Sequence, residues 1–167
     1  MTATVLRADR LLDGTGAAPI ADPHLVIEDG RIVGVHAGGL PQDAVPPETK
    51  TLRFPGCTIL PGLIDTHVHL NLPGDGSLLE TVMRETDGVL LAIAAHTART
   101  ALDAGITTVR DVGAARDTVF DLRRAHRMGH GVFASIVAGG QPITITGGHT
   151  WPWGGEADGE DGCRRIV

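Results

Sequence analysis

The sequence has little of several residue types that often indicate where and how a protein works. Among its 167 residues there is no tyrosine, aromatic residues make up 3%, and Lys50 is the only lysine. The two cysteines, Cys57 and Cys163, lie far apart and form no C-x-x-C pair, so we expect no disulfide framework and a reducing cytoplasm. No apolar run approaches the roughly 18 residues of a membrane-spanning helix. The first residues also lack the apolar stretch of a signal peptide.

The charge balance is mildly acidic, and the composition is that of a folded protein. The formal net charge is −6 and the sequence pI is about 5.7. Because nucleic acids and anionic membranes select for clustered Lys and Arg, neither is an expected partner. Hydrophobic residues make up 42% and charged residues 20%, close to the averages for globular proteins. We therefore expect a soluble cytoplasmic chain with a hydrophobic core.

Short strands separated by turn residues are expected throughout the first sixty residues. The expected strands are 5–8, 24–28, 31–36, 51–54 and 57–60. Asp29-Gly30 lies between the second and third of them, a two-residue hairpin signal because glycine tolerates the positive φ of a type I′ turn. Residues 38–50 are rich in Pro and Gly and predict a loop. This pattern predicts a small β-module.

The pattern changes at Pro61-Gly62 to an alternation of strands and helices. The expected elements are a strand at 63–69, a helix at 77–104, a strand at 106–110, a helix at 117–128, a strand at 132–138 and a helix from about residue 160. Ser77 and Glu80 have the spacing of a capping box at the start of the first helix. Residues 139–159 form a long loop rich in Gly, Pro and Trp. Such alternation predicts right-handed crossovers and a parallel sheet.

The sequence His67-Val68-His69 carries the clearest chemical signal. Residues two apart on a strand face the same side, so both imidazoles are expected to project together. Two such imidazoles can hold one divalent metal ion, with Zn²⁺ the usual partner of nitrogen ligands. Asp65 is expected on the same face and can orient an imidazole. A short H-x-H motif can also arise by chance on a surface strand, so its context decides.

Three motifs in order supply that context. The run F-P-G-C-T-I-L-P-G-L-I-D-T-H-V-H-L from Phe54, after the hairpin I-E-D-G-R-I-V-G-V, resembles the entry into the first barrel strand of the amidohydrolase superfamily. D-A-G-I-T-T-V-R-D-V-G at 103–113 and I-T-I-T-G-G-H at 143–149 are similar to its imidazolonepropionase-like and Xaa-Pro/Xaa-Arg dipeptidase-like branch. The resemblance implies an α/β fold. Residues 1–60 would be an N-terminal β-sandwich segment, and residues 61–167 the first three βα units of an incomplete (β/α)₈ TIM barrel.

The resemblance also implies roles for particular residues. His67 and His69 match the metal ligands of the first barrel strand, with Zn²⁺ as the expected cofactor. Arg110 and His149 would contact the substrate. Asp111, like Asp65, would help to orient the histidine ligands without binding the metal itself. The alternatives are an Arg110–Asp111 pair that braces the barrel mouth and a loop-packing role for His149. Trp151 and Trp153 each have two possible roles: part of a lid that faces the substrate, or packing within the loop.

The family's other catalytic groups are not found in this sequence. They would be a carboxylated lysine or a glutamate on strand four, histidines on strands five and six, and a catalytic aspartate on strand eight. Lys50 precedes strand one and cannot be the bridging lysine. The residues after Gly62 are also well under half of the about 250 that a barrel needs.

The resemblance therefore implies the N-terminal part of a metal-dependent hydrolase. It would cleave the C–N bond of dipeptides or acylated amino acids, or of cyclic amides and imidazolones, through a metal-activated water. A second polypeptide or an oligomer would supply strands four to eight. The alternatives are a catalytically incomplete fragment and a non-catalytic subunit that keeps the family fold.

Overall fold

The computed structural model describes residues 3–41, 45, 48–76 and 84–167. The chain divides into two compact units, residues 1–61 and residues 62–167. Each unit has its own sheet, and each is described by itself below. The first is called the N-terminal unit and the second the C-terminal unit.

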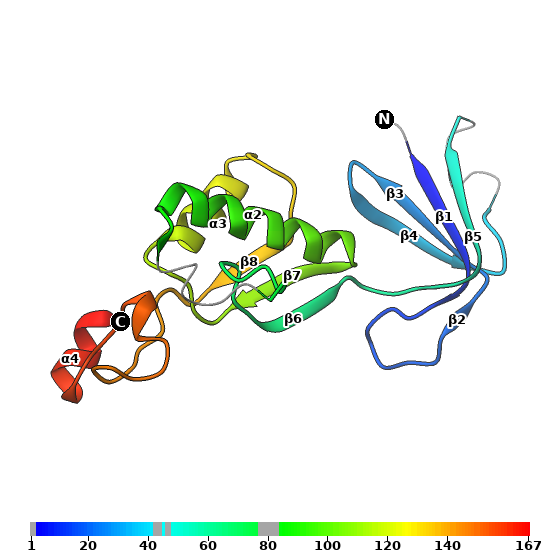
Figure 1. Ribbon diagram of the computed structural model, residues 1–167. Helices are drawn as coiled ribbons and strands as arrows, with labels where there is room; N and C mark the ends of the chain where they lie inside the picture. The colour runs from blue at the N-terminus through cyan, green and yellow to red at the C-terminus, as the bar shows by residue number, and fades with distance from the viewer. Residues whose placement is uncertain (1–2, 42–44, 46–47, 77–83) are drawn as a thin grey trace. The chain divides into compact units, whose positions relative to one another are not determined.

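The N-terminal unit is built on one five-stranded sheet (Figure 1). Its strands are β1 (Thr4–Leu11), β2 (Ile20–Ala21), β3 (Pro23–Glu28), β4 (Arg31–Ala37) and β5 (Lys50–Ile59). β1 pairs with β2 and β3 in antiparallel fashion and with β5 in parallel. β3 also pairs with β4 in an antiparallel hairpin. The predicted β-module is confirmed, although the two-residue strand β2 was not expected.

The β3–β4 hairpin turns where the sequence predicts. Asp29 and Gly30 both have positive φ, 47° and 74°, as a type I′ turn requires. Glu28 pairs directly with Arg31 across this turn. The turn type thus follows from two adjacent residues.

β5 corrects the sequence prediction in one respect. Residues 51–54 and 57–60 were expected as separate strands, but one strand runs from Lys50 to Ile59. Its register against β1 shifts between Ala8 and Arg10, and Gly56 has a φ of 76°. A bulge therefore absorbs the Pro55-Gly56 interruption, because glycine can adopt the left-handed conformation without a steric penalty.

The C-terminal unit is a layer of helices on a parallel sheet. Its elements are β6 (Leu63–Val68), α2 (Asp87–Asp103), β7 (Ile106–Asp111), α3 (Thr118–Arg127), β8 (Ser135–Ala138), η1 (Trp151–Trp153) and α4 (Gly159–Ile166). The sheet order is β6-β7-β8, with both pairs parallel. α2 packs against β7 and α3, and α3 packs against β8, so both helices lie on one side of the sheet (Figure 1). The predicted α/β fold with successive βα units is confirmed.

The first long helix of this unit is shorter than predicted. Ser77 and Glu80, the proposed capping box, lie outside the described residues, and α2 begins at Asp87 after a non-helical Thr86. Thr86 has extended backbone angles, φ −75° and ψ 159°, which are usual for an N-cap. The hydrophobic periodicity runs on through this cap, so the pattern alone could not reveal the break. No helix among the described residues, α2 included, is long and apolar enough to cross a membrane.

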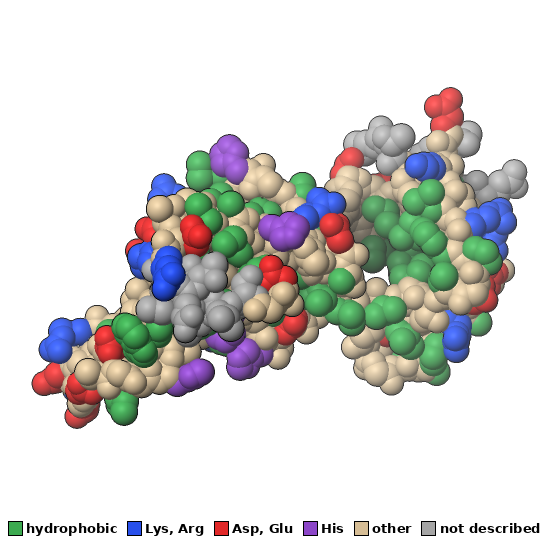
Figure 2. All heavy atoms as spheres, in the orientation of Figure 1, with side chains coloured by type: hydrophobic (Ala, Val, Ile, Leu, Met, Phe, Trp, Pro, Cys, Tyr) green, Lys and Arg blue, Asp and Glu red, His purple; other side chains and the backbone are tan. Residues whose placement is uncertain are grey.

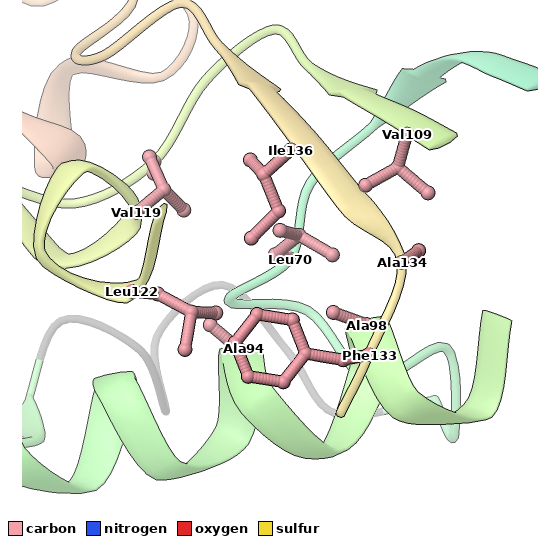
Figure 3. Packing of buried hydrophobic residues seen from close by; sticks show 10 residues of the cluster. Leu70, Ala94, Ala98, Val109, Val119, Leu122, Phe133, Ala134 and Ile136 are labelled. Carbon is pink, nitrogen blue, oxygen red and sulfur yellow. The ribbon is translucent and has the colours of Figure 1, made fainter. Parts of the chain in front are cut away.

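The core of the C-terminal unit lies between its sheet and these helices (Figure 3). It contains fully or almost fully buried side chains from every packed layer: Leu70, Ala94, Ala98, Val109, Ala114, Val119, Leu122, Phe133, Ala134 and Ile136. The two alanines of α2 let the helix approach the strands closely. Burying such apolar side chains removes them from water and provides most of the stabilisation of the unit.

Both units leave apolar side chains uncovered. In β4 of the N-terminal unit, Ile32 and Val33 are 61% and 57% exposed, and Figure 2 shows hydrophobic side chains gathered on this unit's surface. In β6 of the C-terminal unit, Ile64 is 66% exposed. Within the part of the chain that the structure describes, β6 and β8 each pair only with β7. Apolar faces and open edges of this kind normally pack against further strands or another chain.

Candidate metal and substrate site

The two histidines of the H-x-H motif lie at the carboxyl end of β6. His67 is within the strand and exposed, whereas His69 follows it directly and is half-buried. Their ring centroids are 5.5 Å apart, and the rings meet edge to face at 82°. Two imidazoles on one tetrahedral zinc have ring centres roughly 5 Å apart, given Zn–N bonds near 2.0–2.1 Å. The separation of the two rings is therefore compatible with a shared ion of this kind.

A hydrogen bond fixes the protonation of the His69 ring. Its Nδ1 lies 2.8 Å from the carbonyl oxygen of Gly113, and a carbonyl oxygen can only accept a hydrogen bond. Nδ1 must therefore carry a proton and donate it to this bond. In the neutral ring the lone pair is then on Nε2, which leaves that nitrogen free to act as a ligand.

Asp111, the last residue of β7, is fully buried. One carboxylate oxygen accepts a hydrogen bond from the Leu70 backbone N–H at 2.7 Å, and the other accepts one from the Gly113 N–H at 3.0 Å. Burial raises the pKa of Asp111, while these two N–H groups and the nearby His69 oppose the rise. The side chain thus joins the residue after His69 to the residue that bonds the His69 ring. No described ion pair links it to Arg110.

Asn71 is a second buried polar residue beside the motif, and it is not among the residues predicted from the sequence. Its side-chain oxygen accepts hydrogen bonds from the Ala115 N–H at 2.9 Å and the Thr118 hydroxyl at 3.1 Å. Its amide donates to the Leu90 carbonyl at 3.1 Å. It therefore fixes the segment after His69 to α2 and to the start of α3. A lone amide in the apolar run L-N-L was the only sequence signal.

The remaining predicted residues have varied surroundings. The Asp65 carboxylate accepts a hydrogen bond at 3.1 Å from the backbone N–H of His67, and the register of β6 against β7 shifts between Asp65 and Val68. Such a bulge changes the strict alternation of faces along a strand. Arg110 is exposed on β7. His149 is exposed in the loop after β8.

The loop at residues 139–158, called the long loop below, is braced by its own hydrogen bonds. Thr144 forms a parallel β-bridge with Glu156. The Asp158 carboxylate accepts hydrogen bonds from the Thr146 backbone and hydroxyl, and these bonds lower the pKa of Asp158. The Glu156 carboxylate accepts one from the Gly147 N–H at 2.7 Å. The T-G-G-H segment is thus held from the other end of its own loop.

The structure separates the two tryptophans that the sequence left open. Trp151 is 48% exposed, whereas Trp153 is 3% exposed and packs with Leu90 and Ala115. The Trp153 ring centroid lies 4.8 Å from that of His69, with the rings tilted by 49°. Trp153 is therefore a packed residue beside the predicted metal ligand. The amino-acid sequence offered no means of choosing it over Trp151.

No third ligand joins the histidine pair in the described part of the chain. Among these residues there is no group of three His, Cys, Asp or Glu side chains placed to hold a metal ion. If the pair bound a tetrahedral ion, it would fill at most two of the four positions. A complete centre would require further ligands from outside the described residues.

Comparisons with known proteins support a single family. The family model for the Amidohydrolase family matches residues 58–165. An imidazolonepropionase from Saccharopolyspora erythraea is 28% identical over 154 residues, which cover 83% of this chain and 38% of that enzyme. A Xaa-Pro dipeptidase with methionine bound in its active site has a TM-score of 0.75 at 26% identity, covering 93% of this chain and 37% of that one.

A second solved structure agrees with the first. A prolidase in complex with N-methylphosphonate-L-proline has a TM-score of 0.71 at 26% identity, covering 99% of this chain and 39% of that one. The chain thus spans 37% to 39% of the length of these relatives. The predicted resemblance is confirmed, and so is the partial extent of the match.

Proposed function

The chain belongs to the amidohydrolase family, and on that premise we propose that it contributes the first two metal ligands of a hydrolase that cleaves amide-type C–N bonds. His67 and His69 are the ligands in this proposal. Zn²⁺ is the metal best suited to imidazole nitrogens. A zinc ion held there would polarise the scissile carbonyl and activate water for attack on it.

One observation carries the proposal: the two imidazoles are close together, and a hydrogen bond fixes the tautomer of one of them. The two ring centroids are 5.5 Å apart, and the bond from His69 Nδ1 to the Gly113 carbonyl leaves Nε2 as the available nitrogen. Asp111 secures this arrangement by binding backbone N–H groups on both sides of it. Histidines that serve only as strand surface need neither the shared spacing nor the fixed tautomer.

Around the pair, the remaining predicted residues take supporting roles. Arg110, exposed on β7, would meet the carboxylate of a dipeptide or acylated amino acid, because a guanidinium binds carboxylates through two parallel bonds. His149 would approach the substrate from the braced long loop. Asp65 and Asp111 would hold the backbone on either side of the ligands. In this proposal residues 1–60 form a β-sandwich segment and residues 61–167 the first βα units of the barrel.

Dipeptides and acylated amino acids are the first proposed substrates. A similar structure is a Xaa-Pro dipeptidase and another is a prolidase bound to a proline analogue, which favours a dipeptide with a free carboxylate. Cyclic amides and imidazolones are the second class, because a similar protein is an imidazolonepropionase. Two free cysteines favour a reducing, cytoplasmic setting for the reaction.

Catalysis in this proposal needs strands beyond those described. The histidine pair supplies two ligands, and the β6-β7-β8 sheet has unpaired edges in the described residues. Further strands, from the same polypeptide or from a second one, would complete both the metal shell and the barrel. The alternative is a non-catalytic subunit that keeps the fold and the metal pair without turnover.

The test measures metal binding and hydrolysis separately. The purified 167-residue chain is titrated with Zn²⁺ by calorimetry, alongside His67→Ala, His69→Ala and His149→Ala. We expect one weak site per chain that either of the first two substitutions abolishes and the third leaves intact. Equal Zn²⁺ binding in the wild type and the His67→Ala, His69→Ala double variant would refute the ligand assignment.

Hydrolysis is assayed with a Xaa-Pro dipeptide, a Xaa-Arg dipeptide and a cyclic amide, with and without a polypeptide carrying the family's later strands. Activity that appears only in the combined sample supports the proposal that the chain forms part of a hydrolase. Zinc binding without activity in either sample favours the non-catalytic subunit. Turnover by the 167-residue chain alone would contradict the need for further strands.

A further inference from the structure

The contact between Trp153 and His69 has a consequence beyond the metal pair itself. Trp153 is 3% exposed and comes from η1 in the long loop, whereas His69 follows β6. The two rings are 4.8 Å apart between centroids. We infer that Trp153 is a positioning residue: it holds the His69 imidazole in its ligating orientation and ties the long loop, with His149, to the metal pair.

Packing, rather than a hydrogen bond, holds the indole in place. The indole Nε1 is buried and finds no partner among the described residues, so the ring is not aimed by its polar atom. Its neighbours are Leu90 of α2 and Ala115 before α3, with Leu72 and Ile93 packed around them. The His69 ring therefore lies against a buried indole that is packed in the core and tilted by 49° to it.

Gly113 also restricts the space around the His69 ring. A Cβ built on Gly113 would lie 3.2 Å from His69 Cε1 and 3.2 Å from Trp153 Cζ3. Both distances are closer than ordinary van der Waals contact. The same residue's carbonyl accepts the His69 Nδ1 proton. The imidazole is thus confined by a hydrogen bond at Nδ1 and by the indole against its ring, which leaves Nε2 to face a ligand.

The inference extends to the loop because Trp153 is its buried attachment to the core. His149 precedes Trp153 by four residues, separated by Thr150 in the left-handed conformation, with a φ of 69°, and by the exposed Trp151. Trp153 also closes the short helix through its N–H to the Thr150 carbonyl at 3.0 Å. Releasing the indole would free the His69 ring and loosen the loop's packing on Leu90 and Ala115, while the loop's own bonds at Thr146 and Gly147 would remain.

The test compares the same substitution at two tryptophans of one short helix. In Trp153→Leu, long-range ¹H–¹⁵N spectra of the metal-free 167-residue chain should show His69 sampling both imidazole tautomers instead of the Nδ1–H form. Trp151→Leu is the matched control and should leave the tautomer unchanged. Trp153→Phe retains an aromatic ring and should restore the Nδ1–H form. Zn²⁺ affinity in Trp153→Leu should fall by about two- to tenfold, the range expected for losing one aromatic pair.

Two readouts keep this inference separate from the proposed function on which it rests. If the wild type binds no Zn²⁺ but Trp153→Leu still alters the His69 tautomer, the ligand assignment fails and the positioning role survives. An unchanged tautomer and unchanged Zn²⁺ affinity in a folded Trp153→Leu variant would overturn the positioning role. Should that variant not fold, the native chain decides: an NOE between the Trp153 indole and His69 Cε1–H is expected, and its absence overturns the inference.

Discussion

The two units of this chain use aspartate in opposite ways. In the N-terminal unit, Asp22 forms a 3.0 Å ion pair with Arg7 in which both side chains are partly exposed. In the C-terminal unit, Asp111 is fully buried and receives two backbone N–H groups. An exposed pair contributes little because water competes for both charges. A buried acceptor that satisfies buried donors fixes the backbone around it.

This difference bears on where the proposed function lies. The N-terminal sheet is determined by strand pairing and turns, and its charged groups lie at the surface. The C-terminal unit places buried polar side chains beside the histidine pair, where small shifts of the backbone would change the geometry of the proposed ligands. Substitutions in the two units can test this contrast.

Removing the buried carboxylate should have the largest effect. Asp111→Ala leaves the Leu70 and Gly113 N–H groups without an acceptor, and we expect the free energy of unfolding to fall by about 2–5 kcal/mol. Urea denaturation followed by far-UV circular dichroism, which reports the secondary structure of both units, measures this. Asp22→Asn in the N-terminal unit is the control and should change stability only slightly, because asparagine removes the charge and tolerates the positive φ of 43° at this position. Similar losses in the two variants would contradict the contrast between the units.

Truncating the buried amide should come next. Asn71→Ala removes three hydrogen bonds, and we expect a loss of about 2 kcal/mol in the free energy of unfolding. Thr118→Val removes one of these partners together with the hydroxyl's 2.8 Å bond to the Ala115 carbonyl, and should cost less because Asn71 keeps its other two bonds. Hydrogen exchange at the Ala115 amide provides the local readout, since this N–H loses its acceptor only in the first variant. Unchanged protection there would argue against Asn71 as the fixing residue.

One substitution at two glycines should change stability in opposite directions. Gly30→Ala places a Cβ at a φ of 74° in the β3–β4 turn and should cost about 1 kcal/mol. Gly88→Ala lies in α2, where a Cβ meets nothing within 4 Å, and should stabilise by up to about 1 kcal/mol. Thermal unfolding of both variants measures the pair. Effects of the same sign would show that backbone conformation does not decide either site.

The smallest expected effect is on the pH dependence of folding stability, to which Asp22 and Asp111 should contribute with opposite signs. The hydrogen bond from Arg7 lowers the pKa of Asp22. Asp22 therefore stabilises the folded state above its unfolded-state pKa, and this stabilisation is lost as pH falls through the lowered pKa. Burial raises the pKa of Asp111, so the contribution of Asp111 to folding stability decreases as pH rises through the raised pKa. Carboxyl ¹³C titrations of the metal-free chain, with Asp22→Asn and Asp111→Asn for assignment, measure both. Shifts in the same direction would contradict the assignment of causes.

Much of the fold could be predicted because its signals are local. The Asp29-Gly30 turn depends on the φ preferences of two adjacent residues, and both take the positive values expected. The βα alternation after Gly62 depends on hydrophobic period and on glycines that end helices, such as Gly105 with a φ of 88°. Where a local signal was ambiguous, the prediction was wrong, as at the break before α2 and the join within β5.

The same distinction between local and long-range signals applies to the candidate site. The H-x-H pair, its place at the end of a strand and the family that such a strand indicates could all be predicted from the amino-acid sequence. The His69 tautomer and the burial of Trp153 rather than Trp151 depend on tertiary packing. The His69–Gly113 bond joins residues 44 positions apart, and the Asp111–Leu70 bond joins residues 41 apart. Such contacts depend on how strands and helices pack, which neighbouring residues in a sequence do not specify.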